Sequence, residues 1–134
     1  MLRVMFVCKK NSRRSQMAEG FARALGGERV QVTSAGLESS FVDPLTVQAM
    51  QEVGIDISQQ QSKPLRDFQP EDFDVVISLC GCGVSLPTEW LTRDYFADWQ
   101  LEDPEGGELD TFRRVRDQVK ERVVQLLQEH QVLS

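Results

Sequence analysis

The junction between an apolar stretch and a helical pattern near the N-terminus constrains the fold of this chain more than any other feature. Residues 2–7 form the apolar stretch and predict a buried parallel strand. A helix is predicted after a short loop, because apolar residues recur at helical spacing at Met17, Phe21, Ala24 and Leu25. Cys8 therefore lies where a strand ends and a helix follows. Such a junction presents unpaired backbone N–H groups and the positive end of the helix dipole, so it favours a bound anion or a thiolate.

The loop at this junction has the composition of an oxyanion site. Four of the six residues from Lys9 to Arg14 are basic, although the chain has a formal net charge of -6. Cations at a helix N-terminus are unfavourable unless an anion binds there, and an arginine can hold two oxygens of one oxyanion. On these residues alone, Cys8 is either a nucleophile held against an oxyanion or a small apolar residue at the end of a core strand. The predicted oxyanion-binding residues are Lys9, Lys10, Asn11, Ser12, Arg13, Arg14 and Ser15.

Length and composition favour an ordinary globular protein. With 134 residues, 40% of them hydrophobic and 27% charged, residues 1–134 are expected to form one domain with a real core. No apolar run has the length of a membrane span, and Lys9 and Lys10 end the first one too early for a signal peptide. A cytoplasmic location is therefore expected. The acidic balance argues against nucleic acid as a partner. The three cysteines are expected to be reactive or buried rather than joined in structural disulfides.

Strand and helix patterns alternate along the rest of the chain. Strands are predicted at residues 30–34, 74–79 and 95–99, and a long helix has its apolar face between Phe112 and Leu127. A helix in between is expected to be capped by Asp43, to carry Pro44 in its first turn and to end at Gly54. Glycines and prolines make much of residues 80–107 loop. This alternation predicts an α/β fold, in which a parallel sheet has helices on both sides.

The Cys8 loop resembles the active site of low-molecular-weight protein tyrosine phosphatases and of the arsenate reductases that share their fold. The resemblance continues through residues 15–20, 34–36, 54–58 and 112–117, so it covers essentially the whole chain. It is strongest to the cyanobacterial type of arsenate reductase, which is reduced by glutathione and glutaredoxin. The sequence Cys80-Gly81-Cys82 and residues 99–104 carry that closer likeness. The resemblance implies a low-molecular-weight phosphatase-like three-layer fold, with a four-stranded parallel sheet and helices on both faces.

Asp103 is the general acid that the resemblance implies. An oxygen leaving phosphorus or arsenic needs a proton, and the matching aspartate of the family supplies it. The sequence Asp103-Pro104 could otherwise be a simple turn. Phosphatases of the family commonly carry aromatic residues after this pair, whereas Glu105, Gly106 and Gly107 follow here. The missing aromatic wall and the added negative charge disfavour phosphotyrosine and suit a small inorganic oxyanion.

Cys80 and Cys82 indicate a redox reaction, because hydrolysis needs no thiol beyond Cys8. Reduction of arsenate takes two electrons, which thiols can supply. A zinc site is disfavoured, since the chain has no second cysteine pair and His130 is its one histidine; no metal is predicted. The resemblance implies that Cys8 attacks arsenic, that Cys80 then attacks Cys8, and that Cys82 carries the disulfide outward. Glutathione with glutaredoxin, or thioredoxin as the alternative reductant, would recycle the disulfide with no bound cofactor, and the role would be arsenic detoxification.

Two departures from the family pattern qualify this interpretation. Arg13 occupies the position where relatives usually carry a cysteine; the resemblance implies that this cysteine is dispensable, so Arg13 is not expected to inactivate the protein. Some related reductases bind potassium near Asn11, Glu19 and Ser34, but Lys63 stands where they have an aspartate, so potassium is not predicted.

Two alternatives remain open: a phosphatase acting on small or protein phosphoesters, and a sensor that binds oxyanions or responds to oxidation without catalysis.

Overall fold

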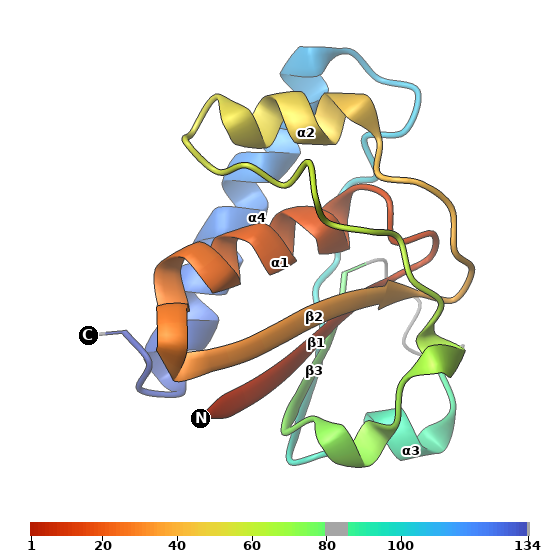
Figure 1. The fold of residues 1–134 in the computed structure, drawn as a ribbon, viewed down its shortest axis with the longest axis vertical. Helices are drawn as coiled ribbons and strands as arrows, with labels where there is room; N and C mark the ends of the chain where they lie inside the picture. Colours follow the sequence, from red (N-terminus) through yellow and green to blue (C-terminus); the bar gives the residue numbers. More distant parts are fainter. Residues whose placement is uncertain (80–85, 134) are drawn as a thin grey trace.

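Four parallel strands form the sheet at the centre of the fold (Figure 1). The computed structural model describes residues 1–79 and 86–133. The strands are β1 (Leu2–Cys8), β2 (Val30–Gly36), β3 (Val75–Ser78) and β4 (Tyr95–Asp98), in the order β2-β1-β3-β4. From β1 the chain first adds β2 on one side of it and later adds β3 on the other side. The carboxyl end of β1 therefore lies at the topological switch point, where open parallel α/β sheets bind ligands. The Cys8 loop begins there.

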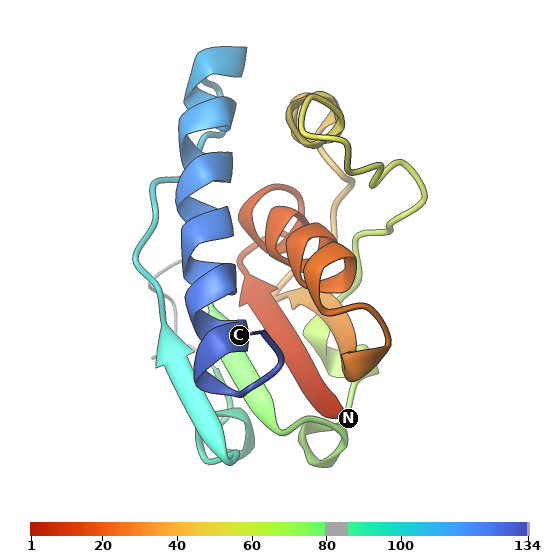
Figure 2. The ribbon, with the colours of Figure 1, turned by 90° about the vertical axis from the view of Figure 1, so that its left-hand side faces the viewer.

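Helices cover both faces of this sheet, as predicted (Figures 1 and 2). One face carries α1 (Arg14–Gly26) and α4 (Leu109–Glu129), and α2 (Pro44–Gln51) packs against these two helices. The other face carries α3 (Thr88–Leu91) and two 3-10 helices, at Leu65–Asp67 and Pro70–Asp72; a third 3-10 helix, Gly27–Arg29, follows α1. Among the described residues, none of the helices is both long and apolar enough to cross a bilayer.

Strand β1 is buried on both faces, which explains why its sequence is nearly continuously apolar. Side chains alternate along a strand, so its odd and even positions enter different cores. Val4 and Phe6 join the core beneath α1 and α4, whereas Met5 and Val7 join the core on the opposite face. All four side chains are fully buried. This double burial fixes the end of β1, and therefore the position of Cys8.

The order of the strands and long helices matches the predicted pattern, although strand bounds shift by one or two residues, the 3-10 helices were not predicted, and two α-helices differ. Helix α2 ends at Gln51, and a turn continues to Gly54, whose φ of 81° is a left-handed conformation that favours glycine. Helix α3 was not predicted, because four residues are too few to show a helical repeat. Cys80 and Cys82, which the sequence assigns to the redox chemistry, lie outside the described residues.

Replacement of Asp43 by alanine is expected to lower the free energy of unfolding by about 1 kcal/mol, the usual effect of losing a helix N-cap. Asp43 caps α2 as predicted, because its Oδ1 accepts a hydrogen bond of 3.0 Å from the backbone N–H of Leu45. Urea denaturation measures the change. Asp43→Asn is the matched control, since asparagine is an equally good cap and should keep the stability close to that of the parent. Equal losses in both variants would show that the carboxylate charge, which also lies 3.4 Å from the Arg13 guanidinium, contributes more than the cap.

Candidate active site

The loop between β1 and α1 is shaped by Asn11. Its φ of 52° lies in the left-handed region, which asparagine tolerates better than most residues. The buried side chain holds this conformation: Nδ2 donates to Ser15 Oγ at 2.8 Å and to Ser34 Oγ at 2.9 Å, and Oδ1 accepts from the Lys63 backbone N–H at 2.9 Å. Asn11 therefore ties the loop to α1, β2 and the segment before Leu65.

Cys8 lies at the bottom of the loop with only 3% of its surface exposed. Its Sγ is 2.9 Å from Ser15 Oγ. The same Oγ already accepts a hydrogen bond from Asn11, so the Ser15 hydroxyl proton is available to the sulfur. A hydroxyl that donates to sulfur stabilises it as an anion, and so does the N-terminus of α1, which begins at Arg14. The arrangement suits a nucleophilic thiolate.

Arg14 is held so that part of its guanidinium remains available to a ligand. Nη1 donates to the carbonyl oxygens of Leu79 at 3.1 Å and Leu101 at 2.9 Å, which fixes the plane of the group beyond the ends of β3 and β4. Among the described residues, Arg14 Nε is the one buried side-chain nitrogen or oxygen without a hydrogen-bond partner. Leaving a buried donor unpaired costs about 1–3 kcal/mol, and an oxyanion would remove that penalty. This nitrogen is the strongest structural indication of an anion site.

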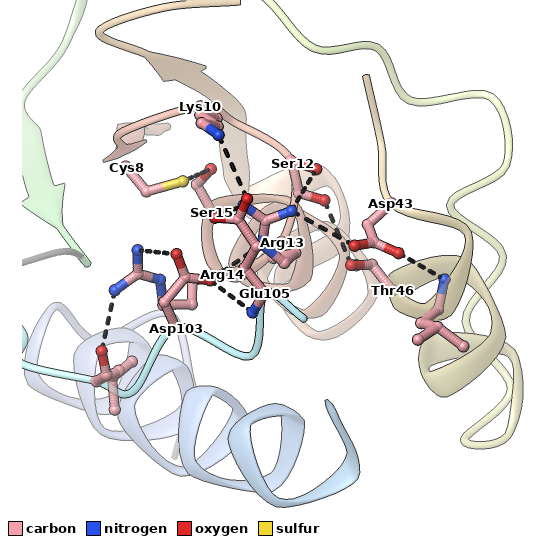
Figure 3. A network of polar contacts seen from close by, with 12 residues as sticks. Cys8, Lys10, Ser12, Arg13, Arg14, Ser15, Asp43, Thr46, Asp103 and Glu105 are labelled. Carbon is pink, nitrogen blue, oxygen red and sulfur yellow. Dashed lines mark hydrogen bonds and ion pairs between the residues drawn. The ribbon is translucent and has the colours of Figure 1, made fainter. Parts of the chain in front are cut away.

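Asp103 faces the Cys8 loop from the segment between β4 and α4 (Figure 3). Its Oδ1 accepts a 3.0 Å hydrogen bond from Arg13 Nε, and its Oδ2 is 3.5 Å from Arg14 Nη2. Burial raises the pKa of Asp103, but the backbone N–H of Glu105 and the guanidinium groups of Arg14 and Arg13 outweigh this effect and hold the pKa below its usual range. Asp103 is therefore a carboxylate in the free site at neutral pH.

These residues enclose a cavity of about 130 Å³. Five of the seven predicted oxyanion-binding residues line it, but Asn11 and Ser15 do not; both are fully buried and brace the loop instead. Glu105 lines the cavity although it was not among the predicted site residues; the charge noted after Asp103-Pro104 was the signal that pointed to it. The lining residues are Cys8, Lys9, Lys10, Ser12, Arg13, Arg14, Asp103 and Glu105.

Arg13 lies in this site but its charge is balanced within the protein. The sequence predicts an added positive charge beside the oxyanion. In the structure the guanidinium forms ion pairs with Asp43 at 3.4 Å, Asp103 at 3.0 Å and Glu105 at 3.2 Å, and donates to Ser12 Oγ. Arg13 therefore connects the Cys8 loop to the start of α2 and to the segment that carries the candidate acid.

A second polar cluster lies behind the loop, around the buried Glu19. Its carboxylate accepts a 2.5 Å hydrogen bond from Ser34 Oγ and lies 2.8 Å from Arg23 Nη2 and 3.6 Å from Lys63 Nζ. The lysine that replaces the family's aspartate thus brings an ammonium group to Glu19. Across residues 1–79 and 86–133, no group of three or more histidine, cysteine or acidic side chains is arranged to hold a metal ion.

Arg14→Lys is expected to lower kcat/KM for any oxyanion substrate by roughly 10²–10³-fold, the usual effect of losing a transition-state hydrogen-bond donor. The variant keeps the charge, but one ammonium group cannot bind two carbonyl oxygens and present a planar pair of donors at once. Separate measurements of kcat and KM should show a loss in kcat as well as in kcat/KM. Kinetics close to those of the parent would mean that the guanidinium does not bind the oxyanion.

Comparison with known proteins agrees with the fold and shows the family. The family model described as "Low molecular weight phosphotyrosine protein phosphatase" matches residues 3–132. The chain belongs to this family. A glutaredoxin arsenate reductase of Synechocystis sp. is 63% identical over 127 residues, which cover 95% of this chain and 97% of the relative. An arsenate reductase of Staphylococcus xylosus is 40% identical over 122 residues, which cover 87% and 89% of the two chains.

The solved structures include an arsenate reductase in its phosphate-binding state with a TM-score of 0.92. It is 62% identical, and the match covers 96% of this chain and 98% of the other. This likeness confirms the predicted low-molecular-weight phosphatase fold and the predicted resemblance to arsenate reductases.

Proposed function

We propose that this protein is an arsenate reductase that converts arsenate to arsenite in the cytoplasm and serves arsenic detoxification. The convergence of Cys8, Arg14 and Asp103 on a cavity of about 130 Å³ carries the proposal. The Synechocystis relative, named a glutaredoxin arsenate reductase, supports the reaction and the electron donor. The proposal takes residues 1–134 as one domain, in keeping with the family match over residues 3–132.

The first step is nucleophilic attack by Cys8. Loop N–H groups and Arg14 bind the arsenate oxygens, and the thiolate forms a sulfur–arsenic bond while one arsenic–oxygen bond breaks. Asp103 protonates the departing oxygen, which leaves as water. In the free site Arg14 and Arg13 favour the Asp103 carboxylate. A bound oxyanion with negative charge offsets the guanidinium of Arg14, and this raises the proton affinity of Asp103 when the acid is needed.

The second step transfers two electrons to arsenic. The Cys80 thiolate attacks Cys8 Sγ, a disulfide forms between them, and the sulfur–arsenic bond breaks. Its electron pair stays on arsenic, which is thereby reduced from the pentavalent to the trivalent state and leaves as arsenite. Cys82 then attacks Cys80, which frees the Cys8 thiolate and leaves a Cys80–Cys82 disulfide. Since these two cysteines lie outside the described residues, their roles rest on the family resemblance.

An external thiol system completes the cycle. Glutathione with glutaredoxin supplies the two electrons that reduce the Cys80–Cys82 disulfide, and no bound cofactor takes part. A disulfide between residues only two positions apart is expected to be strained, which favours its reduction. The reducing cytoplasm is the compartment that this chemistry requires, because all three thiols must return to the reduced form.

Hydrolysis of small phosphoesters is the second candidate function. The description of the matching family names a phosphotyrosine protein phosphatase, and the chemistry at Cys8, Arg14 and Asp103 is the same up to the covalent intermediate. Water would then attack phosphorus, with no need for further thiols. We expect this activity to be weak, because a glutamate rather than an aromatic residue lines the cavity beyond Asp103.

Steady-state production of arsenite from arsenate distinguishes these functions. The purified protein is supplied with glutathione and glutaredoxin in one reaction and with a thioredoxin system in another, and arsenite is quantified. Continuous arsenite formation that depends on glutaredoxin would support the proposal. Hydrolysis of an aryl phosphate without arsenite formation in either system would contradict it and would favour the phosphatase.

A further inference from the structure

Glu105 connects the two segments that form the cavity. Its Oε1 is 3.3 Å from Lys10 Nζ, and its Oε2 is 3.2 Å from Arg13 Nη2 (Figure 3). One carboxylate therefore binds two cations of the Cys8 loop, each through a different oxygen. The Glu105 side chain itself comes from the segment that carries Asp103, and it lines the same cavity as Lys10 and Arg13.

Arg13 is the fixed end of this bridge. Its side chain is only 9% exposed, and its guanidinium is also held by Asp43, Asp103 and Ser12. Lys10 is 38% exposed and is the looser partner. Because exposed ion pairs contribute little and a rigid guanidinium loses less freedom when it binds, Arg13 determines where Glu105 lies.

The bridge lies at the solvent end of the cavity. Glu105 and Lys10 are 51% and 38% exposed, whereas Cys8 is 3% exposed and forms the bottom of the cavity. The enclosed volume of about 130 Å³ is well below the roughly 300 Å³ at which sites for organic ligands usually begin. A tetrahedral inorganic oxyanion is compact in every direction. An ester of the same anion must extend its organic group past Glu105.

We propose that Glu105, held by Arg13 and Lys10, is a specificity-determining strap that favours inorganic oxyanions over their organic esters. The proposal deepens the arsenate reductase assignment and rests on it for the identity of the site. An ester enters only if Glu105 swings away, which breaks both ion pairs and leaves the Arg13 guanidinium with one partner fewer. An inorganic oxyanion enters without that rearrangement. The strap therefore weakens the binding of organic esters and leaves the binding of inorganic oxyanions unaffected.

Binding of two matched ligands, inorganic phosphate and phenylphosphonate, tests the strap without any catalytic turnover. Both carry a tetrahedral anionic head, but only phenylphosphonate carries an aryl group. Each ligand protects Cys8 from alkylation by iodoacetamide, and mass spectrometry of the Cys8 peptide gives its dissociation constant. Glu105→Ala is expected to lower the ratio of the phenylphosphonate constant to the phosphate constant by about fivefold, the effect of losing two partly exposed ion pairs.

Glu102→Ala is the matched control. It removes a glutamate from the same segment and breaks an exposed ion pair of 2.7 Å with Arg114, but Glu102 does not line the cavity. Its ratio should equal that of the parent. An unchanged ratio in Glu105→Ala would overturn the strap proposal. This includes the case in which both ligands bind more tightly by the same factor, because Glu105 would then act only through its charge.

The same assay separates this proposal from the assigned reaction. If phosphate protects Cys8 and the ratio falls in Glu105→Ala, the strap holds even if the parent forms no arsenite, and only the reductase assignment fails. If neither ligand protects Cys8 in the parent, the strap is overturned together with the oxyanion site.

Discussion

Replacement of Cys8 by serine is expected to abolish arsenate reduction and aryl phosphate hydrolysis together, with a loss of roughly 10⁴-fold or more in kcat. In the proposed mechanism both reactions begin with attack by this sulfur, which lies in the cavity beside Ser15. A serine hydroxyl is far harder to ionise than a thiol, so the N-terminus of α1 and the Ser15 hydroxyl cannot make it an effective nucleophile. Steady-state assays of both reactions measure the loss.

The Cys8→Ser variant should still bind the oxyanion. Arg14 and the loop N–H groups are unchanged, so calorimetric titration with phosphate should give a dissociation constant close to that of the parent. Loss of turnover with retained binding assigns Cys8 to the chemistry rather than to the shape of the loop. Appreciable turnover by the purified variant would remove Cys8 from the role of nucleophile.

Replacement of Cys82 by serine is expected to stop multiple-turnover arsenate reduction and to leave aryl phosphate hydrolysis close to the parent rate. In the proposed mechanism hydrolysis needs only Cys8, Arg14 and Asp103, whereas reduction must also pass its oxidising equivalents on to an external thiol. In a single turnover the variant should release about one arsenite per chain and then stall as a Cys8–Cys80 disulfide, because no third thiol is present to attack it. Mass spectrometry of alkylated peptides identifies the bridged sulfurs.

Cys80→Ser provides the comparison for this relay. It should release no arsenite even in a single turnover, because the thiol that attacks Cys8 is missing. Rapid cycling of arsenate by Cys82→Ser would contradict the three-cysteine relay. A parallel fall in hydrolysis would instead show that Cys82 supports the structure of the active-site loop, and would strengthen the phosphatase alternative.

The sequence allowed the fold to be predicted because its strongest signals are local. The apolar run of β1, the periodicity of α4 and the Asp43-Pro44 start of α2 each depend on neighbouring residues. Cys8 and Arg14 could be predicted for the same reason, since one short loop carries both. Helix α3 could not, because a single turn leaves no periodic pattern.

The contacts of Arg13 show what local patterns cannot reveal. Its carboxylate partners Asp43 and Asp103 are 30 and 90 positions away in the chain, so only the folded protein brings them together. Asn11 and Ser15 were predicted to bind the oxyanion, yet their side chains hydrogen-bond to each other behind the loop. Residue type and spacing indicated that the loop binds an anion, but which side chains face the cavity depends on the backbone conformation at Asn11.

A single-turnover experiment with the fully reduced protein tests the central claim most directly. The protein is freed of external thiols and mixed with excess arsenate, and both arsenite and the remaining free thiols are quantified. The account predicts about one arsenite per chain and the loss of two thiols, because one disulfide supplies two electrons. No arsenite and three intact thiols, from a protein that still hydrolyses an aryl phosphate, would contradict it.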